Sequence, residues 1–155
     1  MKNNAGFSTG SVSIVVNRPP TDAWAAVSDV ARMGEWSPEC TACRWVGNAT
    51  GPSVGAKFEG DNVAKFAGRT LKAWTTTSEV TECEPGRVFA FVVEGYTTWR
   101  YDFEAAGPAT KITESFAYNP TGFQGFLYTK VLRRDAAMTN GMRRTLERIK
   151  AALEI

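Results

Sequence analysis

Apolar and polar residues alternate along the middle of the chain. In residues 97–105, TTWRYDFEA, the side chains of Trp99, Tyr101 and Phe103 fall on one face and polar residues fall between them. A period of two is typical of a β strand with one buried face. Short turn sequences separate consecutive strands, which predicts antiparallel neighbours. Six such strands are predicted, at residues 43–50, 55–63, 73–83, 87–95, 97–105 and 110–118.

One more strand and three helices are predicted around this run. Residues 11–17, SVSIVVN, are apolar and β-branched and predict a first strand. Proline and aspartate near the start of residues 18–30 favour a short helix. A second short helix is expected within residues 31–39, and it should stop before Pro38. From about Phe126 to Ile155 apolar residues recur mainly at threes and fours, which predicts a long amphipathic helix. Its apolar side can cover the aromatic face of the sheet.

The composition fits one globular α+β domain. Of 155 residues 43% are hydrophobic and 22% charged, and no apolar run approaches the roughly 20 residues that span a bilayer. We expect residues 1–10 to be a disordered tail and residues 11–155 a single domain. The N-terminus lacks the apolar segment of a secretory signal, which favours a cytoplasmic protein. The net charge is only +2, so nucleic acid is not expected as a partner.

These elements, in this order, resemble the START-like (SRPBCC) superfamily, and within it the polyketide cyclase/dehydrase-type members. The motifs that carry the resemblance are GEWSPE at 34–39, the W-x-Y-x-F strand, TKITESF at 110–116 and GMRRTLERIKAALE at 141–154. The likeness spans residues 11–154. It implies a helix-grip fold, in which a curved seven-stranded antiparallel sheet wraps a long C-terminal helix around a cavity. Members bind hydrophobic small molecules, and a minority are cyclases, dehydratases or other enzymes.

The candidate ligand-binding residues lie on the inward face of the predicted sheet and of the last helix. Large aromatic side chains form flat apolar walls, and methionine adapts its shape to a ligand. For any one of these residues, simple core packing is the alternative. The set is Trp74, Phe89, Phe91, Trp99, Tyr101, Phe103, Glu114, Phe116, Met138 and Met142.

Glu114 is the most informative single residue, because it shares a face with Ile112, Phe116 and Tyr118. A buried carboxylate needs a partner or a raised pKa. Glu114 and Tyr101 are therefore the candidate catalytic residues, with Glu114 as a general acid or base or as a polar anchor. The alternative is a structural hydrogen bond from Glu114 to Tyr101 or to an arginine of the last helix.

The Cys40-x-x-Cys43 motif is expected to be inert. The chain has no histidine and only three cysteines, too few for a structural zinc site of four such ligands. The motif also precedes a strand rather than opening a helix, unlike the motif of thioredoxin-like proteins. Because two residues three apart point to opposite faces of a regular strand, the two sulfurs should neither chelate a metal nor form a disulfide. No metal or cofactor is predicted.

Three functions remain open. The first is a binding protein for a hydrophobic or aromatic small molecule, such as a lipid or a polyketide-like compound. The second is a cyclase or dehydratase-type enzyme that uses Glu114, Tyr101 and water. The third is a regulatory partner protein, suggested only by the basic last helix. We expect a monomer or homodimer. Gly122 and Gly125, which flank Phe123, lie either in an ordinary loop or in a gate over the pocket. A kink in the last helix or a close approach to the sheet would explain Gly141.

Overall fold

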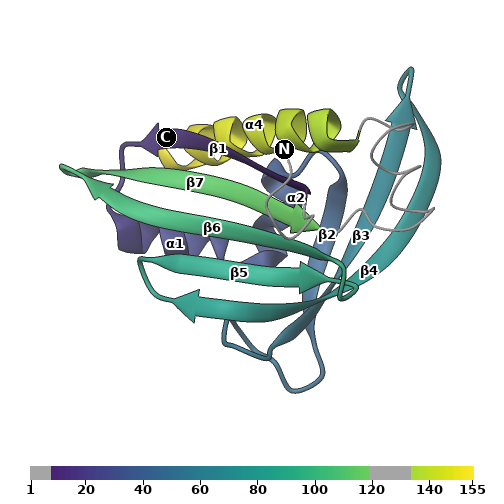
Figure 1. The fold of residues 1–155 in the computed structure, drawn as a ribbon, viewed down its shortest axis with the longest axis horizontal. Coiled ribbons are helices and arrows are strands. Elements are labelled where there is room, and N and C mark those ends of the chain that lie inside the picture. Colours follow the sequence, from purple (N-terminus) through teal and green to yellow (C-terminus); the bar gives the residue numbers. More distant parts are fainter. Residues whose placement is uncertain (1–7, 119–133) are drawn as a thin grey trace.

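The computed structural model describes residues 8–118 and 134–155, and it shows one curved antiparallel sheet of seven strands. The strand order is β1-β7-β6-β5-β4-β3-β2, so β1 and β2 form the two edges (Figure 1). Together with the C-terminal helix this confirms the predicted helix-grip fold. The strands are β1 (Ser8–Val16), β2 (Cys40–Val46), β3 (Lys57–Phe66), β4 (Arg69–Glu84), β5 (Val88–Val93), β6 (Thr97–Ala106) and β7 (Ala109–Tyr118).

The first strand begins earlier than its sequence predicts. β1 starts at Ser8 and pairs with β7, with Gly10 opposite Phe116. Residues 8–10 therefore belong to the sheet and not to the predicted tail of residues 1–10. The reason is local: a Cβ added to Gly10 would lie 2.7 Å from the Phe116 ring, so a glycine lets β1 pass beside that ring.

The helices cover one face of the sheet. They are α1 (Pro20–Val27), α2 (Met33–Trp36), which follows a 3₁₀ turn at Val30–Arg32, and α4 (Arg134–Leu153). Proline at the first position of α1 needs no backbone partner, and the Trp24 indole anchors this helix by donating to the Val88 carbonyl at 2.9 Å. Among the described residues, no helix is both long and apolar enough to cross a bilayer.

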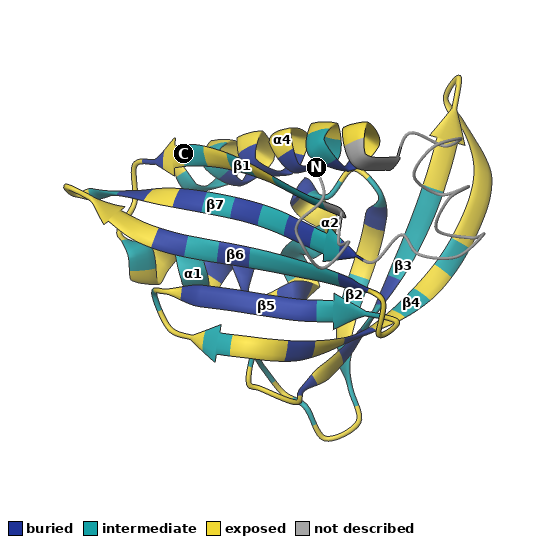
Figure 2. Ribbon diagram, in the orientation of Figure 1, coloured by how far each residue is buried: buried dark blue, intermediate teal, exposed yellow. Residues whose placement is uncertain are grey.

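Buried residues alternate with less buried ones along much of β6 and β7, as the period of two predicts, whereas Val88–Phe91 of β5 are all buried (Figure 2). The larger core cluster joins α1 and the C-terminal half of α4 to the inner face of the sheet and includes Ala23, Phe89, Phe103 and Ile149. A second, smaller cluster consists of Phe116, Tyr118, Met138 and Met142, with Val12 and Trp99 packed against it. Both clusters lie between the sheet and the helices, which fixes that face as the inner one.

The turns follow the predicted chemistry. The Arg87 amide donates to the Glu84 carbonyl at 3.0 Å across Pro85-Gly86, and Gly86 has a φ of 75°. Only glycine adopts this left-handed conformation without strain, as the third residue of a type II turn requires.

The expectation that Cys40 and Cys43 point to opposite faces of a regular strand is wrong. Their sulfur atoms lie 3.1 Å apart, on the same side of β2. The pairing of β2 with β3 shifts register between Cys40 and Ala42, so Thr41 is an extra residue in the strand. A bulge of this kind breaks the alternation of side chains, and the argument from a regular strand no longer holds.

Gly141 lies inside α4 (Arg134–Leu153). A Cβ placed there would lie 3.8 Å from Cγ of Pro38, an ordinary contact, and Pro38 precedes β2 rather than lying in the sheet. The expected close approach to the sheet is therefore not found.

Replacing Gly141 with alanine should raise the free energy of unfolding by about 0.5–1 kcal/mol, because glycine in a helix interior loses more conformational entropy than alanine. Urea denaturation of the two proteins measures this difference. A loss of stability in the variant would show that the position needs glycine.

Candidate functional site

A buried carboxyl and a buried phenol meet on the inner face of the sheet. Tyr101 in β6 lies directly opposite Glu114 in β7. The Tyr101 hydroxyl donates a hydrogen bond of 2.9 Å to Oε2 of Glu114. The two residues are 5% and 4% exposed, so the pair is closed off from bulk water. This is the hydrogen bond between Glu114 and Tyr101 that the sequence left open as the structural alternative, and a catalytic role of the two residues stays a prediction.

The second carboxyl oxygen of Glu114 has no such partner. Oε1 is buried and accepts or donates no hydrogen bond among the described residues. Burial raises the pKa of Glu114 to about 8, although the bond from Tyr101 opposes the rise. Burial, followed by the charge of Glu114, likewise raises the pKa of Tyr101 well above its ordinary value. At neutral pH the Glu114 carboxyl is therefore mainly protonated, with Oε2 accepting the hydrogen bond from Tyr101 and Oε1 able to carry the acid proton and donate it.

Aromatic and thioether side chains surround this carboxyl on one side. Phe116 is the next inward residue of β7, and its ring centre lies 5.8 Å from that of Trp99 in β6. Phe116 also stacks on Tyr118 at 5.9 Å. Met138 and Met142 of α4 pack against these two rings. These side chains form an apolar wall, and the Glu114 carboxyl is the polar group at its border.

The structure divides the predicted site residues into three groups. Trp99, Tyr101, Glu114, Phe116, Met138 and Met142 come together as described above. Phe89, Phe91 and Phe103 belong to the larger core cluster, which also includes Tyr101. In that cluster Phe91 contacts Phe58 edge to face and Phe89 at a tilt. Trp74 lies in neither cluster; it is partly exposed on β4, with the Lys72 ammonium 5.5 Å from its ring centre.

Sequence reasoning missed a row of polar residues on the inner face of β3 and β4. Ser78 is buried, and Asn62 donates a hydrogen bond of 3.2 Å to the Thr76 hydroxyl. The signal was present in the alternation of Thr76, Ser78 and Val80, but the surrounding TTTSEV segment is too polar to mark an inner face clearly. The proposed gate at Gly122, Phe123 and Gly125 lies outside the described residues.

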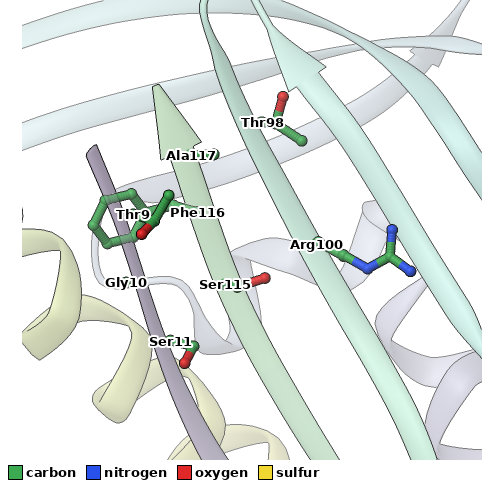
Figure 3. A pocket seen from close by; sticks show the side chains of 8 residues that line it. All are labelled: Thr9, Gly10, Ser11, Thr98, Arg100, Ser115, Phe116 and Ala117. Carbon is green, nitrogen blue, oxygen red and sulfur yellow. The ribbon is translucent and has the colours of Figure 1, made fainter. Parts of the chain in front are cut away.

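A separate open hollow lies on the opposite, outer face of the sheet, between β1, β7 and β6 (Figure 3). Its volume is about 540 Å³. The guanidinium of Arg100 is already paired with Asp102 at 3.0 Å and with Glu82. This hollow therefore offers small hydroxyl groups but no free charge, and it does not reach Glu114. Its lining residues are Thr9, Gly10, Ser11, Thr98, Arg100, Ser115, Phe116 and Ala117.

Within residues 8–118 and 134–155, no three histidine, cysteine, aspartate or glutamate side chains cluster closely enough to hold a metal ion. The chemistry that the inner site offers is therefore that of a neutral carboxyl, a phenol and an apolar wall.

Comparison with known proteins gives a consistent picture. A family model described as "Polyketide cyclase / dehydrase and lipid transport" matches residues 9–154. The solution structure of a polyketide cyclase-like protein from Corynebacterium glutamicum is 37% identical, with a TM-score of 0.65, over 94% of this chain and 91% of that one. No protein in the curated set matches the chain.

Two more distant structures share the fold. The di-domain aromatase/cyclase StfQ of the steffimycin biosynthetic pathway is 16% identical, with a TM-score of 0.70, over 96% of this chain and 51% of that one. Ara h 8.0201 is 12% identical, with a TM-score of 0.68, over 96% of this chain and 98% of that one. At these identities the likeness concerns the fold alone.

Proposed function

Because the chain belongs to the polyketide cyclase / dehydrase and lipid transport family, of START-like (SRPBCC) type, we propose that it binds a hydrophobic small molecule between the sheet and α4. The proposed ligand has an aromatic or otherwise flat apolar body and carries a carbonyl oxygen. Lipids with such a group and polyketide-like compounds both fit this description.

One observation carries the proposal: Oε1 of Glu114 is buried and has no hydrogen-bond partner in the part of the chain that the structure describes. Leaving a buried polar atom without a hydrogen bond costs about 1–3 kcal/mol, so a fold seldom keeps one without a use. A ligand carbonyl that accepts the proton of this carboxyl would remove the cost.

The wall beside Glu114 supports the same ligand class. Trp99 and Phe116 offer aromatic surface, and Met138 and Met142, which pack against it from α4, offer apolar surface that can adapt to a ligand. Pockets for small molecules are commonly lined in this way, with apolar walls and a few placed polar groups.

The proposal predicts that a carbonyl-bearing ligand and its hydrocarbon parent respond differently to changes at Glu114. Anthraquinone should bind the wild-type protein, and Glu114→Leu should weaken it about tenfold, the effect of losing roughly 1.4 kcal/mol of hydrogen bonding. Anthracene, with the same three rings but no carbonyl, should bind both proteins about equally. Quenching of tryptophan fluorescence measures both affinities.

Glu114→Gln is the matched control, because its amide can still donate a hydrogen bond, and it should retain anthraquinone. The proposal fails if neither compound binds the wild-type protein. It also fails if the leucine variant weakens both compounds to the same extent.

A second candidate function is favoured by the pKa of Glu114, which burial brings to about 8. A carboxyl with a pKa near the working pH is suited to general acid or base catalysis. In an enzyme of the cyclase or dehydratase type, Glu114 would protonate a substrate carbonyl while Tyr101 holds the carboxyl in place. Glu114→Gln separates the two functions, because it should abolish turnover of a polyketide-type substrate and keep anthraquinone binding.

A further inference from the structure

Two thiols lie unusually close together at the start of β2. The sulfur atoms of Cys40 and Cys43 are 3.1 Å apart. The bulge at Thr41 brings Cys40 opposite Asn62 and Cys43 opposite Gly60, and these two positions of β3 are two residues apart and share a face. Same-face neighbours on a strand are separated by about the largest Cα distance that a disulfide spans.

The facing strand leaves room for both sulfurs. A Cβ added to Gly60 would lie 3.1 Å from Sγ of Cys43 and 3.5 Å from Sγ of Cys40. The two sulfurs therefore fill the space that the side chain of any residue other than glycine would need at position 60. A third sulfur, Sδ of Met33 in α2, lies 3.7 Å from Sγ of Cys43 and accepts a weak hydrogen bond.

We infer that Cys40 and Cys43 form a redox modification site, at which the two thiols close reversibly to a disulfide. The sulfur atoms need to approach by only about 1 Å to reach the bonding distance of a disulfide. Cys40 is 6% exposed, whereas Cys43 is half-buried, so a small oxidant can reach the pair from the Cys43 side.

The oxidant assigned to this site is a low-molecular-weight disulfide. One protein thiolate attacks a sulfur of that molecule, its S–S bond breaks, and one small thiol leaves with a proton. The second protein thiolate then attacks the mixed disulfide and releases the second small thiol. Two protein thiols thus become one disulfide while one small disulfide becomes two thiols.

The hydrogen bond between the two sulfurs makes the two thiols unequal in acidity. The hydrogen bond between the sulfurs lowers the pKa of Cys40, although burial opposes this, while the same bond and then burial raise the pKa of Cys43. The pair therefore releases a first proton more readily than a second. Thiolate, rather than thiol, is the attacking species in disulfide exchange.

The bulge is also connected to the helices. A Cβ added to Gly34 of α2 would lie 2.4 Å from the Thr41 carbonyl oxygen, so α2 rests directly on the bulged residue. The Trp36 carbonyl at the end of α2 accepts a hydrogen bond of 3.4 Å from Arg148 of α4. Closing the disulfide would therefore fix the segment on which α2 packs.

The test counts free thiols after equilibration with oxidised and reduced glutathione. The protein is then denatured, alkylated with a maleimide and weighed. The wild-type chain should lose two of its three alkylatable thiols, and peptide mapping should find Cys40 joined to Cys43. Cys83→Ser is the matched variant, because it keeps only the proposed pair and should lose both thiols. Cys40→Ser and Cys43→Ser should form no internal disulfide.

Repeating the equilibration in urea, which unfolds the chain, measures how much the folded structure favours the disulfide. We expect the equilibrium constant for closing the disulfide to be roughly tenfold larger in the native protein than in the unfolded chain. The inference is overturned if the native protein keeps all three thiols, if Cys83 is a partner, or if the native and unfolded constants are equal.

Discussion

Glu114→Gln should remove a fall in stability that the wild-type protein shows as the pH rises. In the folded protein the Glu114 pKa is about 8, above the ordinary value of 4.5 that holds in the unfolded chain. Between these two values the folded state retains a proton that the unfolded state has lost, so raising the pH favours unfolding. Each pH unit costs about 1.4 kcal/mol, which gives a loss on the order of 4 kcal/mol between about pH 5 and pH 8.

The measurement is the free energy of unfolding in urea at several pH values for both proteins. Near pH 5 the two should have similar stability, because a neutral carboxyl and an amide have similar shape and polarity. The glutamine variant should then become the more stable protein, by an amount that grows up to about pH 8 and then levels off. Glu104→Gln, at an exposed position of β6, should follow the wild-type curve. A constant difference at all pH values would show that Glu114 titrates as it does in water.

Phe58→Ala should destabilise the protein by about 3–5 kcal/mol, whereas Phe66→Ala should change its stability by less than about 0.5 kcal/mol. Both residues lie in β3, eight positions apart. Phe58 is 2% exposed and contacts the rings of Trp45 and Phe91, with centres 5.6 Å and 5.1 Å away. Phe66 is 72% exposed at the end of the same strand.

This pair of variants tests how far the core extends along the sheet. The residue type and the strand are the same, so the difference in stability reports burial beneath the helices and the loss of packing contacts. Urea denaturation at constant pH measures it. If both variants lost the same free energy of unfolding, the core would extend to Phe66, contrary to the structure.

The sequence predicts much of this fold because alternation and turn chemistry are local properties. The turn at Gly107-Pro108 joins Ala106 to Ala109, and counting outward from these paired residues brings Tyr101 opposite Glu114. The meeting of the carboxyl and the phenol follows from this register once the turn is recognised. Burial of Glu114 follows from its apolar neighbours on the same face of β7.

Other features of the structure cannot be predicted from the alternation of apolar and polar residues. A single extra residue at Thr41 reverses the side on which Cys43 lies, and its own side chain gives no sign of the bulge. Whether an inward aromatic side chain joins the apolar wall beside Glu114 or the larger core cluster depends on which helix lies above its strand. Phe89 and Phe103 share the phase of the site residues but lie beneath α1 and the C-terminal half of α4.

The most direct test of the central claim is a crystal structure of the protein grown with anthraquinone. The account predicts that the ring system lies between the Trp99–Phe116 wall and α4, with one carbonyl oxygen about 3 Å from Oε1 of Glu114. The account is contradicted if Oε1 bonds to another protein group and the interior holds no ligand, or if the compound occupies only the outer hollow.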